Sequence, residues 1–185
     1  MKWIQEYYPY LQSDIEDVLG YIPASIITGA LGTLVILILY RIGTGSWQWK
    51  KGFCYLLFLT YLIAVVQITY LSRLPGSRTG IELGLGATWG TTVQAHSYVI
   101  ENVLLFVPFG IFFPMLGRVP KRICIPVAIL VSSLIEGMQY LTQRGFCQLD
   151  DVVANSLGAI IGYMIIILLK RLQKIMKRRI YEEKY

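Results

Sequence analysis

The sequence has little charge for its length. Only 15% of its 185 residues are Asp, Glu, Lys or Arg, whereas 55% are hydrophobic. Soluble domains carry about 25% charged residues. The charges that are present fall in short stretches between long charge-free runs. This pattern excludes an ordinary soluble domain and is typical of a membrane protein.

Motifs of the common enzyme and nucleic-acid-binding classes are also absent. There is no GxSxG, no HExxH, no glycine-rich phosphate loop and no cysteine spacing typical of a metal site. The net charge of +6 lies beside apolar runs and not on a basic face interleaved with aromatic residues, so we expect no nucleic-acid partner. The sequence identifies no cofactor and no metal site, and it leaves open whether the protein is an enzyme.

Five apolar segments are long enough to cross a hydrocarbon core of about 30 Å as helices. They cover residues 22–40, 53–71, 98–116, 123–141 and 152–169. Backbone groups in lipid must be satisfied within a helix or a closed barrel, and no alternating pattern supports a barrel. The sequence therefore predicts an all-α, polytopic membrane bundle with a five-helix domain over residues 22–169.

Two segments flank this predicted domain. Residues 1–21 lack the pattern of a cleavable signal peptide. After Pro9, apolar residues recur at helical spacing opposite acidic ones, which predicts an amphipathic helix at the membrane surface, with a loose polar tail as the alternative. Residues 170–185 are rich in Lys and Arg and are expected to form a basic cytoplasmic tail.

The positive charges predict the orientation of the bundle. Thirteen of the seventeen Lys and Arg residues fall in the first loop, the third loop and the C-terminal tail, which five spans place on one side. Because basic loops remain in the cytoplasm, we expect the N-terminus outside the cell and the C-terminus inside. Cys147, between the last two spans, is then expected outside.

Polar side chains occur near the predicted outer ends of the last three spans, where they are costly and indicate a functional site. From the helical rise, Glu136 lies about 7 Å below the outer end of its span, and Asn155 lies about 5 Å below that of the next. We expect an outward-facing polar pocket, with a purely structural hydrogen-bonded cluster as the alternative. The candidate acid–base residues are Glu136, Asp150 and Asp151, and the candidate ligand-binding residues are Arg73, Glu101, Asn102, Gln139, Arg144 and Asn155.

Glycine and proline add three expectations. Gly158 and Gly162 share a predicted helical face with Asn155 and would let a neighbouring helix approach closely. Pro108 is expected to kink the third span. Residues 72–97 are punctuated by glycine and predict a mobile or re-entrant outer loop.

Three short motifs together resemble the VanZ-like family of bacterial integral membrane proteins. They are Asn102-Val-Leu-Leu-Phe-Val-Pro108-Phe-Gly110, Glu136-x-x-Gln139, and Arg144-Gly145 followed by Asp150-Asp151, Asn155 and Gly158. The resemblance covers residues 73–165. It implies a role in the bacterial envelope and lower susceptibility to teicoplanin and related lipoglycopeptides, with which the family's namesake is associated. It supplies no catalytic mechanism, and Gln148 stands where it leads us to expect an acidic residue, which weakens a metal or proton site.

Three functions fit these observations. The leading one is binding or modification of an envelope lipid or cell-wall component at the outer leaflet, with Arg73 and Arg144 contacting an anionic or hydroxylated headgroup. Membrane lipids are the expected partners, and a lipid-linked cell-wall precursor or a lipoglycopeptide is a further candidate. The alternatives are an acid–base or metal-assisted enzyme acting on a lipid headgroup, and a lipid or small-molecule transporter. Whether the chain forms a homo-oligomer is left open.

Overall fold

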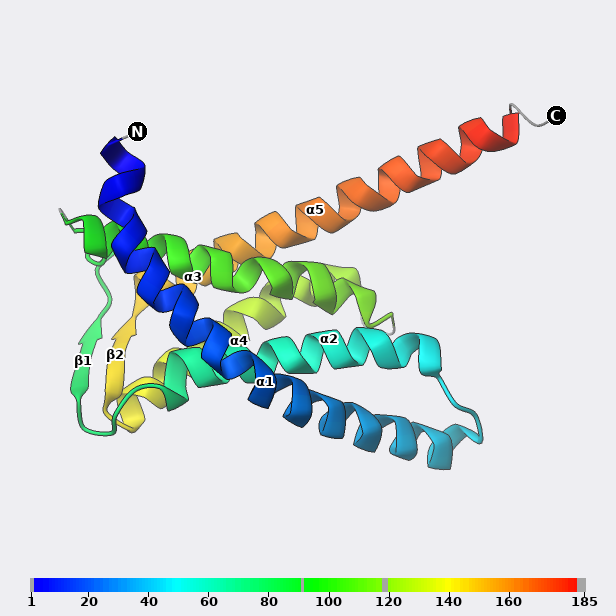
Figure 1. The fold of residues 1–185 in the computed structure, drawn as a ribbon, viewed down its shortest axis with the longest axis horizontal. Helices are drawn as coiled ribbons and strands as arrows, with labels where there is room; N and C mark the ends of the chain where they lie inside the picture. The colour runs from blue at the N-terminus through cyan, green and yellow to red at the C-terminus, as the bar shows by residue number, and fades with distance from the viewer. Residues whose placement is uncertain (1, 91, 118–119, 183–185) are drawn as a thin grey trace.

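The computed structural model describes residues 2–90, 92–117 and 120–182, and most of them lie in five long helices (Figure 1). The helices are α1 (Lys2–Thr44), α2 (Trp49–Val66), α3 (Val93–Phe112), α4 (Cys124–Leu141) and α5 (Leu149–Glu182). Each helix contains a stretch long and apolar enough to cross a membrane, and these are Leu19–Thr44, Lys51–Leu71, Val93–Met115, Cys124–Leu141 and Leu149–Tyr181. The prediction of five helices long and apolar enough to span a membrane is therefore confirmed.

The first helix is longer than the predicted first span. The segment 2–21 is helical and continuous with the span, so it does not form a separate helix. Extending an existing helix needs no new nucleus, which favours continuation over a break. Most side chains of this segment, and all of residue 1, lie outside the described residues, so its amphipathic placement at the membrane surface stays a prediction.

Part of the loop at 72–97 forms a small parallel sheet that the sequence did not predict, whereas the mobility or re-entry of this loop stays a prediction. Strand β1 (Arg78–Glu82) comes from this loop and pairs with β2 (Arg144–Gln148), which joins α4 to α5. The register sets Arg78 opposite Arg144 and Glu82 opposite Gln148. Partners this far apart along the chain leave no local signal in the sequence, because parallel strands need a long crossover connection.

Three short helical turns complete the chain. A π-helical turn, η1 (Gln67–Leu71), extends α2, and the 3-10 turns η2 (Phe113–Met115) and η3 (Lys121–Ile123) lie between α3 and α4. α3 itself remains α-helical through Pro108. The kink predicted at this proline stays a prediction.

Glycines set the close packing of α3 against α5, as the sequence predicted. A Cβ at Gly158 would collide with the carbonyl oxygen of Val103, and one at Gly162 would collide with that of Val107. Gly110 on α3 packs equally tightly against the backbone of α5. These three glycines therefore allow the two backbones to touch, which suits helices that associate in lipid.

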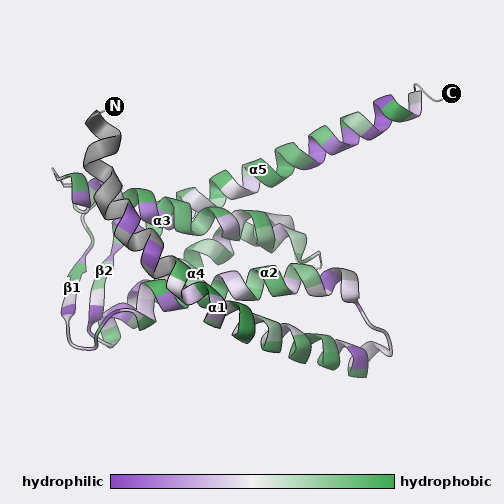
Figure 2. Ribbon diagram, viewed as in Figure 1, coloured by the Kyte–Doolittle hydropathy of each residue, from purple (hydrophilic) through white to green (hydrophobic). Residues whose placement is uncertain are grey.

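The core between the helices is aromatic. Phe58 of α2 packs edge-on against Phe109 and Phe113, with ring centroids 5.6 and 6.0 Å apart. Phe109 also stacks on Phe106, which is fully buried. Many large apolar side chains on the helices are exposed, among them Leu39, Leu141 and Met164. Figure 2 shows that apolar residues make up much of the length of the helices. Outward apolar surface of this extent is expected where helices face lipid tails.

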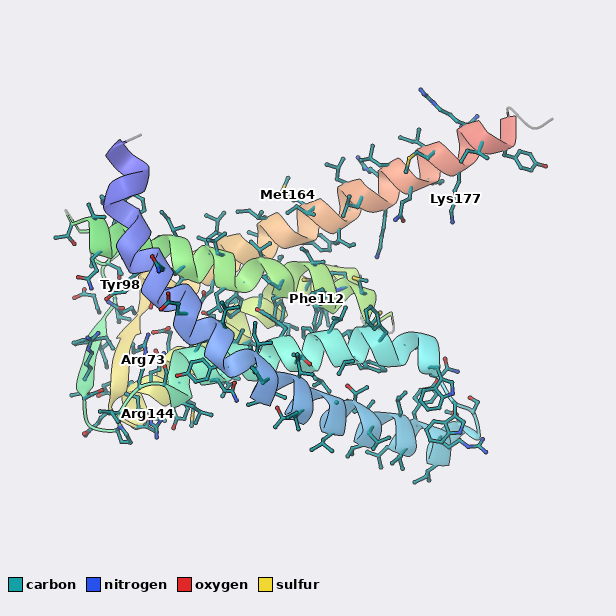
Figure 3. The ribbon with its side chains drawn as sticks, viewed as in Figure 1. Arg73, Tyr98, Phe112, Arg144, Met164 and Lys177 are labelled. Atoms are coloured by element: carbon teal, nitrogen blue, oxygen red, sulfur yellow. The ribbon has the colours of Figure 1, made fainter. Side chains whose placement is uncertain are left out.

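The two ends of the bundle differ in character. The strands and the N-terminus of α5 lie at one end, here called the sheet end, and the connection between α1 and α2 lies at the other (Figure 1). Arg73 and Arg144 lie at the sheet end, whereas Lys177 lies far along the projecting part of α5 (Figure 3).

Candidate functional site

Polar side chains are buried at the sheet end of the bundle. Glu136, Gln139 and Asn155 are each only 3% exposed, and Ser132 is fully buried. They lie on α4 and α5, which run antiparallel from the two sides of β2. Their burial among helices makes every unsatisfied donor or acceptor costly, so their partners define what the site can do.

The seam between α4 and α5 has two polar layers. In the inner layer, Asn155 Nδ2 donates a hydrogen bond to Ser132 Oγ at 2.8 Å. One helical turn nearer the sheet end, Glu136 and Asp151 are close enough to interact electrostatically. Residues four apart on a helix share a face, so Ser132 and Glu136 on α4 meet Asn155 and Asp151 on α5.

The two carboxylates of the outer layer are positioned by different elements. Glu136 Oε2 accepts a 2.9 Å hydrogen bond from the backbone nitrogen of Gln148, the last residue of β2. The Asp151 carboxylate is hydrogen-bonded by the side chain of Asn102 on α3. Arg73, after the π-helical turn, is near enough to interact electrostatically with both acids. This layer therefore joins α3, α4, α5 and the end of α2.

Gly145 lies where β2 passes close to two side chains of the site. A Cβ there would lie 2.6 Å from Arg73 Nη1 and 3.3 Å from the Gln139 side chain. A larger residue here would require the flexible Arg73 side chain to shift. This is the physical role of the glycine in the Arg144-Gly145 motif.

The π-helical turn η1 offers its carbonyl groups to the neighbouring side chains. Gln139 Nε2 donates to the Thr69 carbonyl at 2.7 Å. Arg144 Nη1 donates to the carbonyls of Tyr70 and Arg73 at 3.1 and 3.0 Å, and its guanidinium lies over the Tyr70 ring. A π turn interrupts the regular ladder, and such turns occur often at functional sites. Arg144 is thus engaged in capping the end of α2.

Asp150 is also engaged by backbone groups. Its Oδ1 accepts from Gly86 N and its Oδ2 accepts from Thr88 N, both at 2.8 Å. These bonds fasten the turn after β1 to the first turn of α5. Asp150 therefore holds the outer loop against the start of α5.

Two buried acceptors at the seam have no hydrogen-bond partner in the protein. Among the described side chains, Asp151 Oδ1 and Asn155 Oδ1 are both of this kind. A buried polar atom without a partner costs about 1–3 kcal/mol. Asp151 and Asn155 are four residues apart on α5, so their two oxygens lie on one face. At this face the seam has more acceptors than donors.

The thiol of Cys147, on β2, is influenced by the charge of Glu136. Burial raises its pKa above that of an ordinary thiol, and the Glu136 carboxylate raises this pKa further by disfavouring the thiolate. Cys147 is half-buried, and its thiol is free, as are the thiols of the other two cysteines.

The structure brings together most of the residues that the sequence selected. Glu136, Asp151, Asn102, Asn155 and Arg73 lie around the α4–α5 seam. Gln139 lies beside Arg73 near Gly145, and Glu101 precedes Asn102 on α3 and is half-buried. Their roles in catalysis or binding stay predictions.

Sequence reasoning missed the backbone partners of these side chains. The Gln148 amide that binds Glu136 and the carbonyl that binds Gln139 depend on β2 and on the π turn. Neither element has a local signature in the sequence. Gly145 was visible in the motif, but the close approach that explains it was not.

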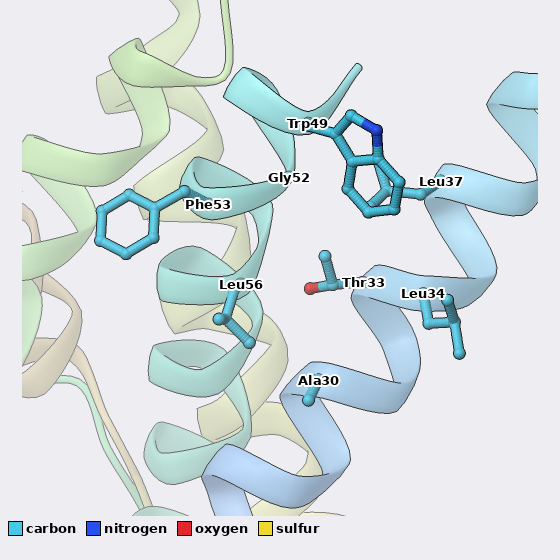
Figure 4. Close-up of a pocket in the computed structure, with 8 residues that line it drawn as sticks. All are labelled: Ala30, Thr33, Leu34, Leu37, Trp49, Gly52, Phe53 and Leu56. Carbon is cyan, nitrogen blue, oxygen red and sulfur yellow. The ribbon is translucent and has the colours of Figure 1, made fainter. Parts of the chain in front are cut away.

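The geometry also bears on metal binding and on cavities. Within the described residues, no three His, Cys, Asp or Glu side chains come together in a group that could hold a metal ion. An apolar groove of about 360 Å³ lies between α1 and α2, lined by Thr33, Leu37, Gly52 and their neighbours (Figure 4). A second groove follows α2 past Leu62 and Val66. Both have nearly wholly apolar walls, and the outward-facing polar pocket stays a prediction.

Comparisons with known proteins point to one family. The family model described as VanZ/LLP1 matches residues 30–170. A curated relative, Protein VanZ from Enterococcus faecium, is 29% identical over 68 residues, which is 35% of this chain and 40% of the relative. The match therefore spans less than half of that relative's length. No solved structure gives a significant match.

Proposed function

The chain belongs to the VanZ/LLP1 family, and we propose that it acts on an envelope lipid or cell-wall component at the extracytoplasmic side of a bacterial plasma membrane. This action lowers susceptibility to teicoplanin and related lipoglycopeptides. The family's namesake is associated with that phenotype, and the distant relative carries its name. The proposal is one of binding or modification at the membrane surface, and it leaves the need for a cofactor open.

The observation that carries the proposal is the buried polar seam at the sheet end. Glu136 and Asn155 are each 3% exposed although they lie in helices that cross the membrane. Buried ionisable groups in such helices are expensive and are kept where they serve a function. A seam that only joined helices would leave its acceptors satisfied, and here two of them have no protein partner.

The charge distribution supports an extracytoplasmic site. Arg41 and Lys51 flank the connection between α1 and α2, at the end of the bundle opposite the strands (Figure 1). The basic residues of α5 also project away from the strands, as Lys177 illustrates (Figure 3). Because basic loops remain in the cytoplasm, the sheet end then faces outward.

The experiment measures teicoplanin susceptibility in a sensitive Gram-positive host that expresses the wild-type protein, Glu136→Gln or Asp151→Asn. Membrane levels of all forms are matched. Glu82→Gln is the matched control, because this exposed carboxylate lies on β1 at the same end and accepts a hydrogen bond from the nearby Gly84 nitrogen. We expect protection from the wild type and the control, and a loss of protection from both seam variants.

Two results would count against the proposal. Full protection from both seam variants would assign the carboxylates to a structural cluster. No protection from the wild type would remove the link to lipoglycopeptides.

Enzymatic modification of a headgroup is a second candidate, favoured by the electrostatic contact of Glu136 with Asp151. Two carboxylates in unlike surroundings are a common arrangement for an acid and a base. Asp151 receives the Asn102 side chain, whereas Glu136 receives a backbone amide from β2. Lipid analysis of cells expressing wild type or Glu136→Gln tests this candidate, which requires a new headgroup species with the wild type alone.

A further inference from the structure

The seam between α4 and α5 has a surplus of hydrogen-bond acceptors. Asp151 Oδ1 and Asn155 Oδ1 are buried and accept no hydrogen bond from a described protein group. The Glu136 carboxylate lies in electrostatic contact with Asp151. Three oxygen-bearing side chains from two antiparallel helices therefore face one region of the protein.

The donors near this region are mostly committed elsewhere. Arg144 donates to the Tyr70 and Arg73 carbonyls and packs on the Tyr70 ring. The Asn155 amide nitrogen is engaged by Ser132. Arg73 is the nearby cation that interacts with both acids, but its side chain is exposed and its field is screened by solvent. Two carboxylates thus face one screened guanidinium, which leaves the seam negative when both are ionised.

We propose that Glu136, Asp151 and Asn155 bind the protonated primary amine of an envelope component. A primary ammonium carries three N–H donors on one positive charge. These donors match the two carboxylates and the amide oxygen in both number and charge. The inference rests on the function proposed above, because it names the ligand group of the same site. It also replaces the anionic headgroup expected from the two arginines, one of which is committed to backbone carbonyls.

The chemistry of the seam favours an ammonium over a metal ion. Calcium takes six to eight oxygen ligands and magnesium requires a near-octahedral set. The described residues provide no group of three acidic, thiol or imidazole side chains suited to a metal. A phosphate would meet the two carboxylates as like charges, which is unfavourable in a partly buried site.

The experiment titrates the purified full-length protein in detergent with short-chain phospholipids that differ only in their amine. The series runs from phosphatidylethanolamine through its N-methyl and N,N-dimethyl forms to phosphatidylcholine. Binding is followed by native mass spectrometry and by the shift in thermal unfolding. Every member keeps the positive charge, and each methyl group removes one N–H donor. We expect the phosphatidylethanolamine to bind about tenfold more tightly than the phosphatidylcholine, the effect of one charge-assisted hydrogen bond.

Variants then connect the preference to the seam. Asp151→Asn and Glu136→Gln are expected to reduce the preference for the primary amine to less than about twofold, because each removes a charged acceptor. Glu82→Gln is expected to keep it. Equal binding across the methyl series by the wild type would overturn the inference without reference to any variant, so loss of folding in a variant does not decide the result.

Two further arms identify the source of the amine and test the metal. Competition by free ethanolamine means that the ammonium alone suffices, whereas failure to compete means that it must be carried on a lipid; both support the proposal. Stabilisation by Mg²⁺ or Ca²⁺ that is lost in the two seam variants, with no preference within the methyl series, would overturn it in favour of a metal site.

The failure of this inference can be separated from that of the proposed function. If the seam variants lose teicoplanin protection but the wild type does not prefer a primary amine, the function stands and the ligand is wrong. If the preference is present and depends on the seam while the variants still protect cells, the binding site stands and the link to lipoglycopeptides fails.

Discussion

Asn155 on α5 donates a hydrogen bond to Ser132 on α4, with Nδ2 2.8 Å from Oγ and both residues buried. This bond forms the floor of the acceptor-rich seam. It orients the amide of Asn155, whose oxygen is buried and has no hydrogen-bond partner among the described groups. The same residue pair therefore bears on the stability of the fold and on the binding that we propose.

Ser132→Ala tests the structural part of this pair. Removal of the hydroxyl leaves the Asn155 amide nitrogen buried without its acceptor, so we expect a loss of about 1–3 kcal/mol in unfolding free energy. Thermal unfolding of the purified protein in detergent provides the measurement. Ser156→Ala is the control, because that hydroxyl bonds only the Val152 carbonyl of its own helix. Equal effects of the two substitutions would show that the bond across the seam contributes no special stability.

Gly158→Ala tests the contact between α3 and α5. The added Cβ would collide with the Val103 carbonyl oxygen, so the helices must separate at a cost of about 1–3 kcal/mol. Gly137→Ala on α4 is the control, since no atom lies within 4 Å of a Cβ there. The control should be neutral or stabilising, because alanine favours the helix by about 1 kcal/mol over glycine. A Gly158 variant as stable as this control would contradict the close packing.

Arg144→Ala tests whether this arginine holds the fold or is available to a ligand. The change removes two hydrogen bonds to carbonyl groups and the contact with the Tyr70 ring, and we expect about 2–3 kcal/mol of destabilisation. Arg144→Lys should destabilise the protein less than Arg144→Ala does. It should still be less stable than the wild type, because an ammonium lacks the planar fork of the guanidinium. Arg78→Ala, at the exposed start of β1, serves as the control. Unchanged stability together with lost binding would instead favour a ligand contact.

Cys147 provides a test of orientation and of the field around Glu136. A membrane-impermeant maleimide should label intact cells at this cysteine, and Cys147→Ser should abolish the signal. The thiolate is the reactive form, and the pKa of this thiol is raised. Labelling should therefore accelerate only at a higher pH than for an ordinary thiol, whose pKa is about 8.5.

Glu136→Gln should accelerate this labelling at a fixed pH, because loss of the negative charge lowers the pKa of Cys147 and increases the thiolate fraction. Labelling that requires permeabilised cells would contradict the predicted orientation. An unchanged rate in the Glu136 variant would show that the carboxylate does not act on the thiol.

Several features of the site were predictable from the sequence. Glu136 and Asn155 could be set at a common depth because helical rise is regular and adjacent spans alternate in direction. Gly158 and Gly162 could be assigned to a packing face because they recur with helical spacing. Each of these predictions needed only local periodicity and the length of a span.

Other features depended on contacts between distant segments. The pairing of β1 with β2 joins two loops separated by α3 and α4, so neither strand is evident alone. Asp150 and Asp151 are adjacent acids with the same sequence context. Only the fold shows that Asp150 is held by Gly86 and Thr88, whereas Asp151 keeps a buried oxygen without a partner.

The sequence alone determined that this chain spans the membrane five times, because the cost of placing charges in lipid divides it into apolar runs and charged connections. It also determined the family, through polar residues and glycines at characteristic spacings. Only the tertiary structure decided which polar groups are held by hydrogen bonds within the fold and which buried oxygens have no partner among the described groups. The reason is that hydrogen-bond partners such as the carbonyls of η1 and the amide of Gln148 come from backbone brought together by folding.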